Sequence, residues 1–314
     1  MEEKTNAEQY KMCFIGVTTK QSIINKIFPR WMELLNYNID LECIDIPMGA
    51  RTEVYRQYVE HIKTNQNLLG ALVTTHKIPI YSASYDLFDD LINSAKEFKE
   101  IGCIYKRNGC LIGEATDIIT VKAAFNDIWI SQKYEQKDNI QICILGCGGA
   151  GVALAHAILS LNYSNVIKIF MIDNNYERIN SAKIALSRYD TKSITNYFLS
   201  EGIKYNDEIV SSLNKNAIVV NATGLGKDLP GAPITKNVIF PYNGCLWEYN
   251  YRGDLIFLDI AKNQEKKYEL NIFDGFNYFI YGWTTVISRV LNIEIDNDMF
   301  NLLASEAKEI YTSI

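Results

Sequence analysis

A glycine-rich segment near the middle of the chain constrains its fold more than any other feature. Residues 142–155 read ICILGCGGAGVALA, so glycines with the spacing G-x-G-x-x-G lie between an apolar, strand-like run and a helix-compatible stretch. A dinucleotide pyrophosphate needs a tight turn at the first glycine, bare backbone at the second and close helix-strand packing at the third, with a helix N-terminus facing its charge. A plain glycine-rich loop is the alternative. We expect the following residues to form the phosphate cradle: Gly146, Gly148, Gly149, Ala150 and Gly151.

An acidic residue follows the next predicted strand. The apolar run from Val166 to Ile172 ends in Asp173, which lies 22 positions after Gly151. At this distance a carboxylate can accept hydrogen bonds from both ribose hydroxyls of an adenosine. A solvated turn residue is the alternative reading of Asp173. Because the charge of Asp173 would repel a 2′-phosphate, we expect NAD in preference to NADP.

Length and composition indicate a two-domain enzyme. The chain has 314 residues, more than a single core usually holds, with 48% hydrophobic and 22% charged residues. Its net charge of -6 and the lack of a Lys/Arg-rich block argue against a nucleic-acid partner. The first ten residues are polar, and no apolar run approaches a membrane span. We expect a cytoplasmic protein without a membrane partner, either a monomer or a homodimer.

The cysteine and histidine positions predict no structural metal. The seven cysteines include no C-x-x-C pair, and most lie in apolar segments, as reduced core thiols do. The three histidines, His61, His76 and His156, are too far apart in the sequence for a recognisable zinc spacing.

Strand-like and helix-like segments alternate along the chain, which predicts an α/β fold with one sheet before the glycine loop and another around it. Residues 101–105 and 110–113 form a predicted hairpin across Asn108-Gly109. Two polar loops, 16–22 and 74–77, follow predicted strands. Open α/β sheets bind ligands beyond the carboxyl ends of their strands, so both loops are candidate sites.

Lys77 and Asp117 carry the candidate chemistry. Lys77 follows a predicted strand, and Asp117 opens a predicted helix over 118–129. A lysine and a carboxylate within hydrogen-bond reach can exchange a proton with a substrate hydroxyl while nicotinamide takes or returns a hydride. A solvated lysine and a helix N-cap are the structural alternatives.

Several segments together resemble the shikimate/quinate dehydrogenase family. They occur in the family's order and at its approximate spacing, so the resemblance covers nearly the whole chain. The segments are GALVTTHK at 70–77, LIGEATD at 111–117, GCGGAG at 146–151, VVNATGLG at 219–226 and DGF at 274–276.

The resemblance implies a substrate-binding α/β domain over 1–119, a Rossmann-type domain over 120–277, and C-terminal helices over 278–314 that pack back on the first domain. It implies an active site in a cleft between the domains, in which Lys77 is the general acid/base and Asp117 orients it. Reversible oxidation of a ring alcohol to a ketone would be the reaction. Substrate contacts are expected at Ser22, Thr74, Tyr105 and Tyr251, and further cofactor contacts at Asn174, Asn221, Thr223 and Gly275.

The departures from the family pattern predict an unusual substrate. Where the family has a second serine and a proline, this chain has Ile24 and Asn25. The family's substrate-binding asparagines are replaced as well, and so are a proline and a glutamine; the replacements are Ala71, Tyr105, Ala115, Thr75 and Gly282. Each lost buried hydrogen bond costs about 1–3 kcal/mol. We therefore expect a polyhydroxylated or amino-substituted cyclic acid other than shikimate.

The cofactor segment also departs from the family. NADP-using members carry an arginine in an N-R-T-like segment, whereas this chain reads Asp173-Asn174-Asn175, with Arg178 nearby. This again favours NAD. The competing hypothesis is a catalytically inactive NAD or metabolite sensor on the same fold. A reductase of the related folate or amino-acid families fits less well, because it does not explain LIGEATD and VVNATG together.

Overall fold

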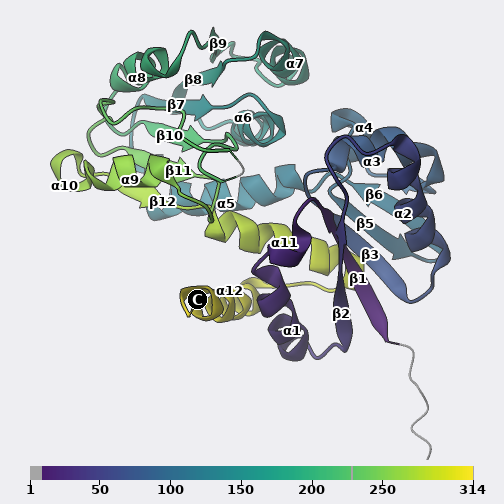
Figure 1. Cartoon of the computed structure of the whole chain (residues 1–314). Coiled ribbons are helices and arrows are strands. Elements are labelled where there is room, and N and C mark those ends of the chain that lie inside the picture. The colour runs from purple at the N-terminus through teal and green to yellow at the C-terminus, as the bar shows by residue number, and fades with distance from the viewer. Residues whose placement is uncertain (1–8, 228, 314) are drawn as a thin grey trace, which may run out of the picture. The chain divides into compact units, whose positions relative to one another are not determined.

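The computed structural model describes residues 9–227 and 229–313. The chain divides into two compact units, each built around its own six-stranded sheet (Figure 1). The first unit runs to Thr116 and resumes at Gly282, and the second extends from Asp117 to Tyr281. The α/β fold class with two sheets is confirmed. The predicted divisions, at 119/120 and 277/278, lie close to those of the structure.

The first unit has a mixed sheet in the order β2-β1-β3-β5-β6-β4. β1 pairs in parallel with β2 and β3, whereas β3-β5 and β5-β6 are antiparallel. The hairpin turn between β5 and β6 has positive φ at both Asn108 and Gly109, as a two-residue loop of this kind requires. The strands are β1 (Tyr10–Gly16), β2 (Ile39–Asp45), β3 (Leu68–Val73), β4 (Asp90–Leu91), β5 (Cys103–Arg107) and β6 (Cys110–Glu114).

Helices cover both faces of this sheet. Val59 and Ile62 of α2 share a core with Ile15 of β1 and Val73 of β3. The opposite face of β1 carries Phe14, whose ring meets that of Trp283 at 4.8 Å. The helices of this unit are α1 (Ile24–Leu34), α2 (Thr52–Thr64), α3 (Lys77–Ser84), α4 (Asn93–Phe98), α12 (Asn297–Thr312) and the part of α11 (Phe276–Leu291) that follows Tyr281.

The C-terminal helices pack back on the first unit, as expected. Trp31 of α1 donates its indole N–H to the carbonyl of Leu303 in α12 at 2.9 Å, and Arg30 pairs with Glu306 at 2.9 Å. The Trp31 hydrogen bond is buried, so the indole N–H has a partner within the interface between α1 and α12.

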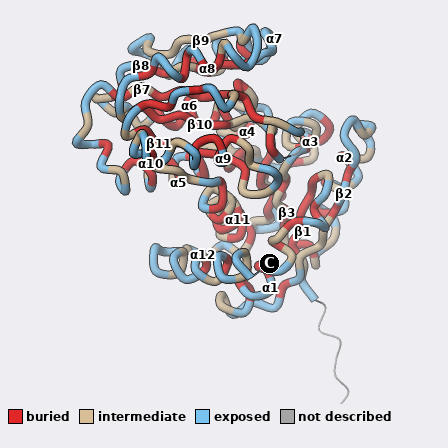
Figure 2. The backbone as a smooth tube through the Cα atoms, turned by 60° about the vertical axis from the view of Figure 1, so that its left-hand side comes forward, coloured by how far each residue is buried: buried red, intermediate tan, exposed pale blue. Residues whose placement is uncertain are grey.

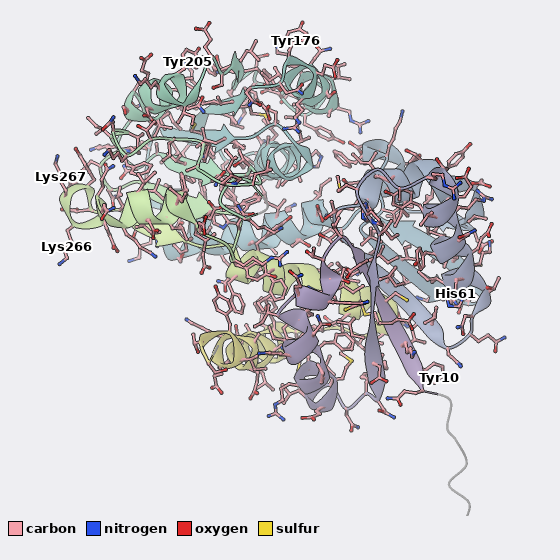
Figure 3. The ribbon with its side chains drawn as sticks, viewed as in Figure 1. Tyr10, His61, Tyr176, Tyr205, Lys266 and Lys267 are labelled. Atoms are coloured by element: carbon pink, nitrogen blue, oxygen red, sulfur yellow. The ribbon has the colours of Figure 1, made fainter. Side chains whose placement is uncertain are left out.

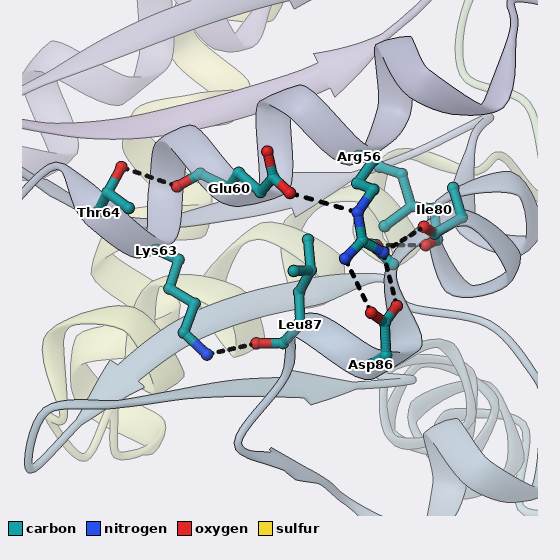
Figure 4. Close-up of polar contacts among 9 residues, drawn as sticks. Arg56, Glu60, Lys63, Thr64, Ile80, Asp86 and Leu87 are labelled. Atoms are coloured by element: carbon teal, nitrogen blue, oxygen red, sulfur yellow. Dashed lines mark hydrogen bonds and ion pairs between the residues drawn. The ribbon is translucent and has the colours of Figure 1, made fainter.

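Polar contacts fasten α2 to the segment that follows α3 (Figure 4). The guanidinium of Arg56 binds both carboxylate oxygens of Asp86, at 2.6 and 2.8 Å, and Lys63 donates to the carbonyl of Leu87. These side chains are partly exposed, so each pair adds little stability and mainly fixes the register of the two segments.

The second unit is an all-parallel sheet in the order β12-β11-β10-β7-β8-β9. Read from the other edge, this is the strand order of a dinucleotide-binding fold, and it reverses between β7 and β10. The strands are β7 (Ile140–Leu145), β8 (Val166–Asp173), β9 (Thr195–Leu199), β10 (Ile218–Asn221), β11 (Cys245–Glu248) and β12 (Asn271–Phe273).

Alternate side chains of the central strands serve two cores, one on each face of the sheet. Ile142 and Ile144 of β7 pack with α5, α6 and α7, whereas Cys143 and Leu145 pack with α8 and α9. Figure 2 shows the central strands buried between exposed helix surfaces. The helices are α5 (Asp117–Ser131), α6 (Gly149–Leu161), α7 (Tyr176–Leu186), α8 (Ile203–Ser211), α9 (Ile256–Lys262), α10 (Glu265–Tyr268) and the start of α11.

Candidate functional site

The predicted phosphate cradle is the loop from β7 to α6, at the point where the strand order reverses. Gly146 has a φ of +111°, and a Cβ there would lie 2.9 Å from the carbonyl oxygen of Ala222 at the end of β10. A Cβ at Gly151 would overlap the carbonyl oxygen of Gly146. Gly148, the N-cap of α6, has open space where its side chain would be. The fold therefore requires glycine at 146 and 151, whereas Gly148 leaves open space in front of the loop.

The N-terminus of α6 begins at Gly149 and Ala150, directly behind this open position. Its first N–H groups have no partner within the helix, and the aligned peptide dipoles favour an anion there. The sequence supplies no side chain at Gly148 or Gly149 that would fill the space in front of these groups. The loop thus has the geometry that a bound diphosphate requires.

Asp173 ends β8 beside this loop and is only 7% exposed. Its Oδ2 accepts the backbone N–H of Cys147 at 2.8 Å, and its Oδ1 accepts the N–H of Asn175 at 2.9 Å. Each carboxylate oxygen has more than one acceptor site, so the side chain can accept further hydrogen bonds. Asp173 therefore supports the glycine loop directly, a role that the sequence pattern did not indicate.

The segment after Asp173 is open. Asn174 is exposed, and Asn175 caps α7 by accepting the N–H of Arg178 at 3.1 Å. The guanidinium of Arg178 lies 3.9 Å from Asp173, and 60% of its side chain is exposed. The structure thus places one acidic and one basic side chain at the end of β8, with the carboxylate the more deeply buried.

The end of β10 carries Asn221 and Thr223, both predicted cofactor contacts. Asn221 is fully buried; its Oδ1 accepts the N–H of Thr223 at 3.0 Å and the hydroxyl of Thr223 at 2.6 Å. Its Nδ2 donates to Glu248 at the end of β11. Glu248 was missed in the sequence, where it follows an apolar strand and has no motif to mark it.

Tyr251 and Gly275 lie further along the same edge of the second unit. The ring of Tyr251 packs against Phe279 at 4.6 Å and Phe276 at 6.1 Å. A Cβ at Gly275 would overlap the carbonyl oxygen of Tyr249, so a glycine is needed for the chain to pass there. Gly275 is thus explained by packing, and its predicted cofactor contact stays a prediction.

In the first unit, the two candidate loops follow the neighbouring parallel strands β1 and β3. Thr74 donates its N–H to the carbonyl of Ile15 at 2.9 Å, and a Cβ on Gly16 would lie 2.5 Å from the Thr74 methyl group. The predicted substrate residues Ser22 and Thr74 thus belong to adjoining loops at one edge of the sheet, as expected for strand ends. Ser22 is largely buried.

Lys77 is the first residue of α3, and its carbonyl accepts the N–H of Ile101 at 3.1 Å. A Cβ on Gly102 would lie 3.6 Å from Lys77 Cε and 3.2 Å from the hydroxyl of Thr116. The side chain of Lys77 therefore runs alongside Gly102, near the residue that precedes Asp117. Asp117 itself begins α5 in the second unit.

His76 has a structural role. It is buried, its Nε2 lies 2.7 Å from the carbonyl of Ile46, and its Nδ1 lies 3.4 Å from the hydroxyl of Tyr55. Because a carbonyl only accepts, Nε2 must carry a proton. These contacts hold the loop before Lys77 against β2 and α2.

Several positions that depart from the family pattern are buried in the first unit. Ile24, Ala71 and Ala115 are buried, and the latter two lie within the core of the first unit. Tyr105 is 7% exposed; burial, helped by the negative charge of Glu114, raises the pKa of its hydroxyl to about 12. A neutral phenol stands where the family has an amide.

Asn25, at the position of the family's proline, restrains the loop that carries Ser22. Its Nδ2 donates to the carbonyls of Thr19, Lys20 and Ser22 at 2.9–3.2 Å. Asp45 accepts both the N–H and the hydroxyl of Thr19 from the other side. At this position, the hydrogen bonds of Asn25 thus restrain the loop conformation in place of the proline ring expected from the family pattern.

Among the described residues, no group of three or more His, Cys, Asp or Glu side chains could hold a metal ion. His61 projects from the surface of α2 (Figure 3), whereas His76 is buried. All seven cysteines are free thiols. No helix in the described part of the chain is long and apolar enough to cross a membrane.

No protein-family model matches the chain. Among curated proteins, the shikimate dehydrogenase (NADP(+)) of Lactococcus lactis subsp. cremoris is 27% identical over 209 residues, which cover 66% of this chain and 68% of that protein. The enzyme of the same name from Streptococcus sanguinis is 28% identical over 177 residues, covering 56% of this chain and 58% of that one. The matched part thus spans less than two thirds of the second relative.

The similarity in fold to solved structures covers nearly the whole chain. Quinate dehydrogenase from Corynebacterium glutamicum, solved in complex with NAD, superposes with a TM-score of 0.73 at 15% identity, covering 98% of this chain and 99% of that one. The relatives are thus dehydrogenases in name, and both NADP and NAD occur among them. The chain is thus similar in sequence to shikimate dehydrogenases, and its fold is similar to that of a quinate dehydrogenase.

Proposed function

We propose that this chain is an NAD(P)-dependent oxidoreductase that reversibly oxidises a ring hydroxyl of a cyclic acid to a ketone. The observation that carries the proposal is the loop between β7 and α6. Gly146 and Gly151 are sterically required there, Gly148 leaves open space, and the helix N-terminus stands behind it at the reversal of strand order. Such a loop binds the pyrophosphate of a dinucleotide.

The proton chemistry is assigned to Lys77 and Asp117. The family resemblance supports this assignment, and within the first unit the Lys77 side chain runs beside Gly102, close to the hydroxyl of Thr116. Lys77 would take the proton of the substrate hydroxyl and return it in the reverse direction; a bound nicotinamide would accept the hydride from the carbon that carries this hydroxyl. Asp117 orients Lys77 and accepts a hydrogen bond from the substrate.

The substrate is proposed to be a polyhydroxylated or amino-substituted cyclic acid other than shikimate. Buried apolar side chains at Ile24, Ala71 and Ala115 support this, since none of them can hydrogen-bond a ring hydroxyl or a carboxylate. Ser22 and Thr74 remain as hydroxyl groups at the edge of the first sheet.

NAD is the proposed cofactor. The carboxylate of Asp173 stands at the end of β8, where it would accept from ribose hydroxyls and repel a 2′-phosphate. The name of the Lactococcus relative points to NADP, whereas the C. glutamicum quinate dehydrogenase was solved with NAD. Arg178, with an exposed guanidinium near Asp173, is the group through which NADP would be accommodated.

A thermal-shift series tests the proposal. We expect NAD to raise the melting temperature more than NADP does, because a ligand that binds only the folded state stabilises it. With NAD present, a panel of shikimate, quinate and aminated analogues should give its largest shift with a compound other than shikimate, and that compound should support NAD reduction. A protein that binds NAD but reduces it with no member of the panel would favour the sensor hypothesis. No shift with either dinucleotide would contradict the proposal.

A further inference from the structure

A buried carboxyl joins the ends of two neighbouring strands in the second unit. Strands β10 and β11 lie side by side (Figure 1), and Glu248, which ends β11 and is fully buried, is the register partner of Asn221. Neither its charge nor its volume is needed for strand pairing, which uses backbone groups only. A buried ionisable side chain at this edge therefore calls for a separate explanation.

Glu248 meets only hydrogen-bond donors. Its Oε2 accepts from Asn221 Nδ2 at 2.5 Å, and its Oε1 accepts from the backbone N–H of Asn250 at 2.8 Å and from Asn250 Nδ2 at 2.6 Å. An ionised carboxylate, which only accepts, satisfies all of these contacts at once. A protonated carboxyl would have to turn its own O–H toward one of these donors and lose that hydrogen bond.

Thr223 and Glu248 together allow only one orientation of the Asn221 amide. The N–H of Thr223 can only donate, so the group that faces it must be Asn221 Oδ1, and Nδ2 must then face Glu248. In this orientation Oδ1 also accepts the hydroxyl of Thr223, whose oxygen accepts the N–H of Leu225 at 3.2 Å. A chain of hydrogen bonds thus runs from Glu248 to Leu225.

Asn250 fastens the same loop from its other side. While held by Glu248 Oε1, its Nδ2 also donates to the carbonyl of Thr223 at 3.2 Å. Both the N–H and the carbonyl of Thr223 are therefore held by side chains that Glu248 orients. Residues 221–225 adjoin the glycine loop, since a Cβ on Gly146 would lie 3.0 Å from Ala222 C and 3.2 Å from the Thr223 methyl group.

We propose that Glu248 is a positioning residue for cofactor binding, which sets the conformation of residues 221–225 by fixing the amide orientations of Asn221 and Asn250. This inference rests on the proposed function, because it assumes that the loop beside the glycine cradle receives a dinucleotide. Burial raises the pKa of the Glu248 carboxyl to about 7, against the hydrogen bonds from Asn250 and Asn221. The chain thus keeps an ionisable side chain at this buried position, at a cost that simple packing would not require.

The test compares Glu248→Gln with a reciprocal exchange, Asn221→Asp/Glu248→Gln. In the single variant, a Gln side chain whose oxygen serves Asn250 turns its NH₂ toward Asn221 Nδ2, so two donors face each other. In the exchange, the carboxylate at 221 accepts from Thr223 and from the Gln amide, so every hydrogen bond is restored and only the bond between positions 221 and 248 has its donor and acceptor exchanged. Glu208→Gln, at an exposed carboxyl of α8, is the matched control.

Dissociation constants for NAD are measured by calorimetry at pH 8, and exchange rates of the Thr223 and Leu225 amides are measured without ligand. For Glu248→Gln we expect NAD affinity to fall about tenfold, which corresponds to 1.4 kcal/mol, and amide exchange to accelerate. The reciprocal exchange should return both quantities to within about threefold of the wild type. Lowering the pH from 8 to 6 should weaken NAD binding to the wild type and leave Glu248→Gln unchanged.

The outcomes separate this inference from the proposed function. If the wild type binds neither NAD nor NADP, the proposed function fails, and the ligand-free amide exchange still tests the positioning role. If Glu248→Gln binds NAD as the wild type does and keeps slow amide exchange, the inference is overturned. A reciprocal exchange that folds with wild-type stability but stays impaired in both quantities also overturns it, because hydrogen-bond direction would then not be what Glu248 supplies.

Discussion

The carboxylate of Asp173 holds the backbone of Cys147. This 2.8 Å hydrogen bond joins the end of β8 to the middle of the glycine loop at the end of β7, while the other carboxylate oxygen accepts from Asn175. The residue proposed to bind the ribose therefore also shapes the loop proposed to bind the pyrophosphate. Changing Asp173 should therefore weaken the binding of both the ribose and the pyrophosphate.

Replacing Asp173 should consequently affect both stability and binding. In Asp173→Asn, one of the two backbone N–H groups faces an NH₂ instead of an acceptor, which costs about 1–3 kcal/mol of unfolding free energy. NAD affinity should fall as well. Denaturant unfolding and calorimetry measure the two quantities, with Asp138→Asn at an exposed turn as control. Unchanged stability would show that the Cys147 contact contributes nothing.

The three glycines of the loop should respond differently to alanine. Gly148→Ala places its Cβ in open space at φ -73°, so we expect stability to change by no more than about 1 kcal/mol while NAD affinity falls sharply. Gly151→Ala forces its Cβ into the Gly146 carbonyl, so the fold itself should be destabilised. Melting temperatures with and without NAD distinguish the two effects. Normal NAD binding by Gly148→Ala would place the phosphate elsewhere.

Cofactor preference should be adjustable at Asn174. This residue is exposed directly after Asp173, at the position where NADP-using relatives of this type are expected to carry arginine. Asn174→Arg should improve NADP affinity about tenfold through charge-assisted hydrogen bonds to the 2′-phosphate. Asn174→Gln, which lengthens the side chain without adding charge, should leave the ratio of NADP to NAD affinity unaltered. Equal ratios in the two variants would contradict the assigned ribose position.

The raised pKa of Glu248 predicts a dependence of stability on pH. Burial raises this pKa from 4.5 to about 7, so between these values the folded state binds more protons than the unfolded state. Stability contributed by Glu248 is therefore complete below pH 4.5 and is lost as the pH rises to about 7. The loss has an upper bound of roughly 3 kcal/mol, at 1.36 kcal/mol per pKa unit.

Comparison with Glu248→Gln isolates this effect, because other titrating groups are common to both proteins. The unfolding free energy of the wild type minus that of Glu248→Gln should decrease from pH 5 to pH 8. A flat difference would mean that Glu248 has an ordinary pKa in the folded protein.

The glycine spacing and the apolar runs made much of the architecture predictable. The strand expected up to Ile172 is part of β8, the hairpin at Asn108-Gly109 is present, and the C-terminal helices pack on the first unit. These features depend on local patterns: alternating burial, turn residues and helix periodicity. The short strands β4 and β12 and the helices α8 to α10 were not predicted, because they are brief or only partly buried.

The candidate site was predictable where a motif marks it and not where long-range contacts build it. The glycines and Asp173 were singled out from their spacing after predicted strands, and Lys77 from its place after a strand together with the family resemblance. The Glu248 network was not predicted, because it forms only when β10 and β11 pair. This pairing brings Asn221 beside Glu248, which lies 27 positions away in the sequence. The restraint of the Ser22 loop by Asn25 was missed for the same reason. The sequence shows a polar residue in place of proline but does not indicate the three carbonyls to which its side chain donates.

The central claim is that Lys77 transfers the proton in a nicotinamide-dependent oxidation. Its most direct test is steady-state turnover of Lys77→Ala with the best substrate of the panel, with NAD affinity measured in parallel and Lys204→Ala, at an exposed position of α8, as control. We expect kcat to fall at least about 100-fold in Lys77→Ala, with the Kd for NAD within about threefold of the wild type and the control unaffected. If Lys77→Ala keeps more than about a tenth of the wild-type kcat, Lys77 is not the general acid/base.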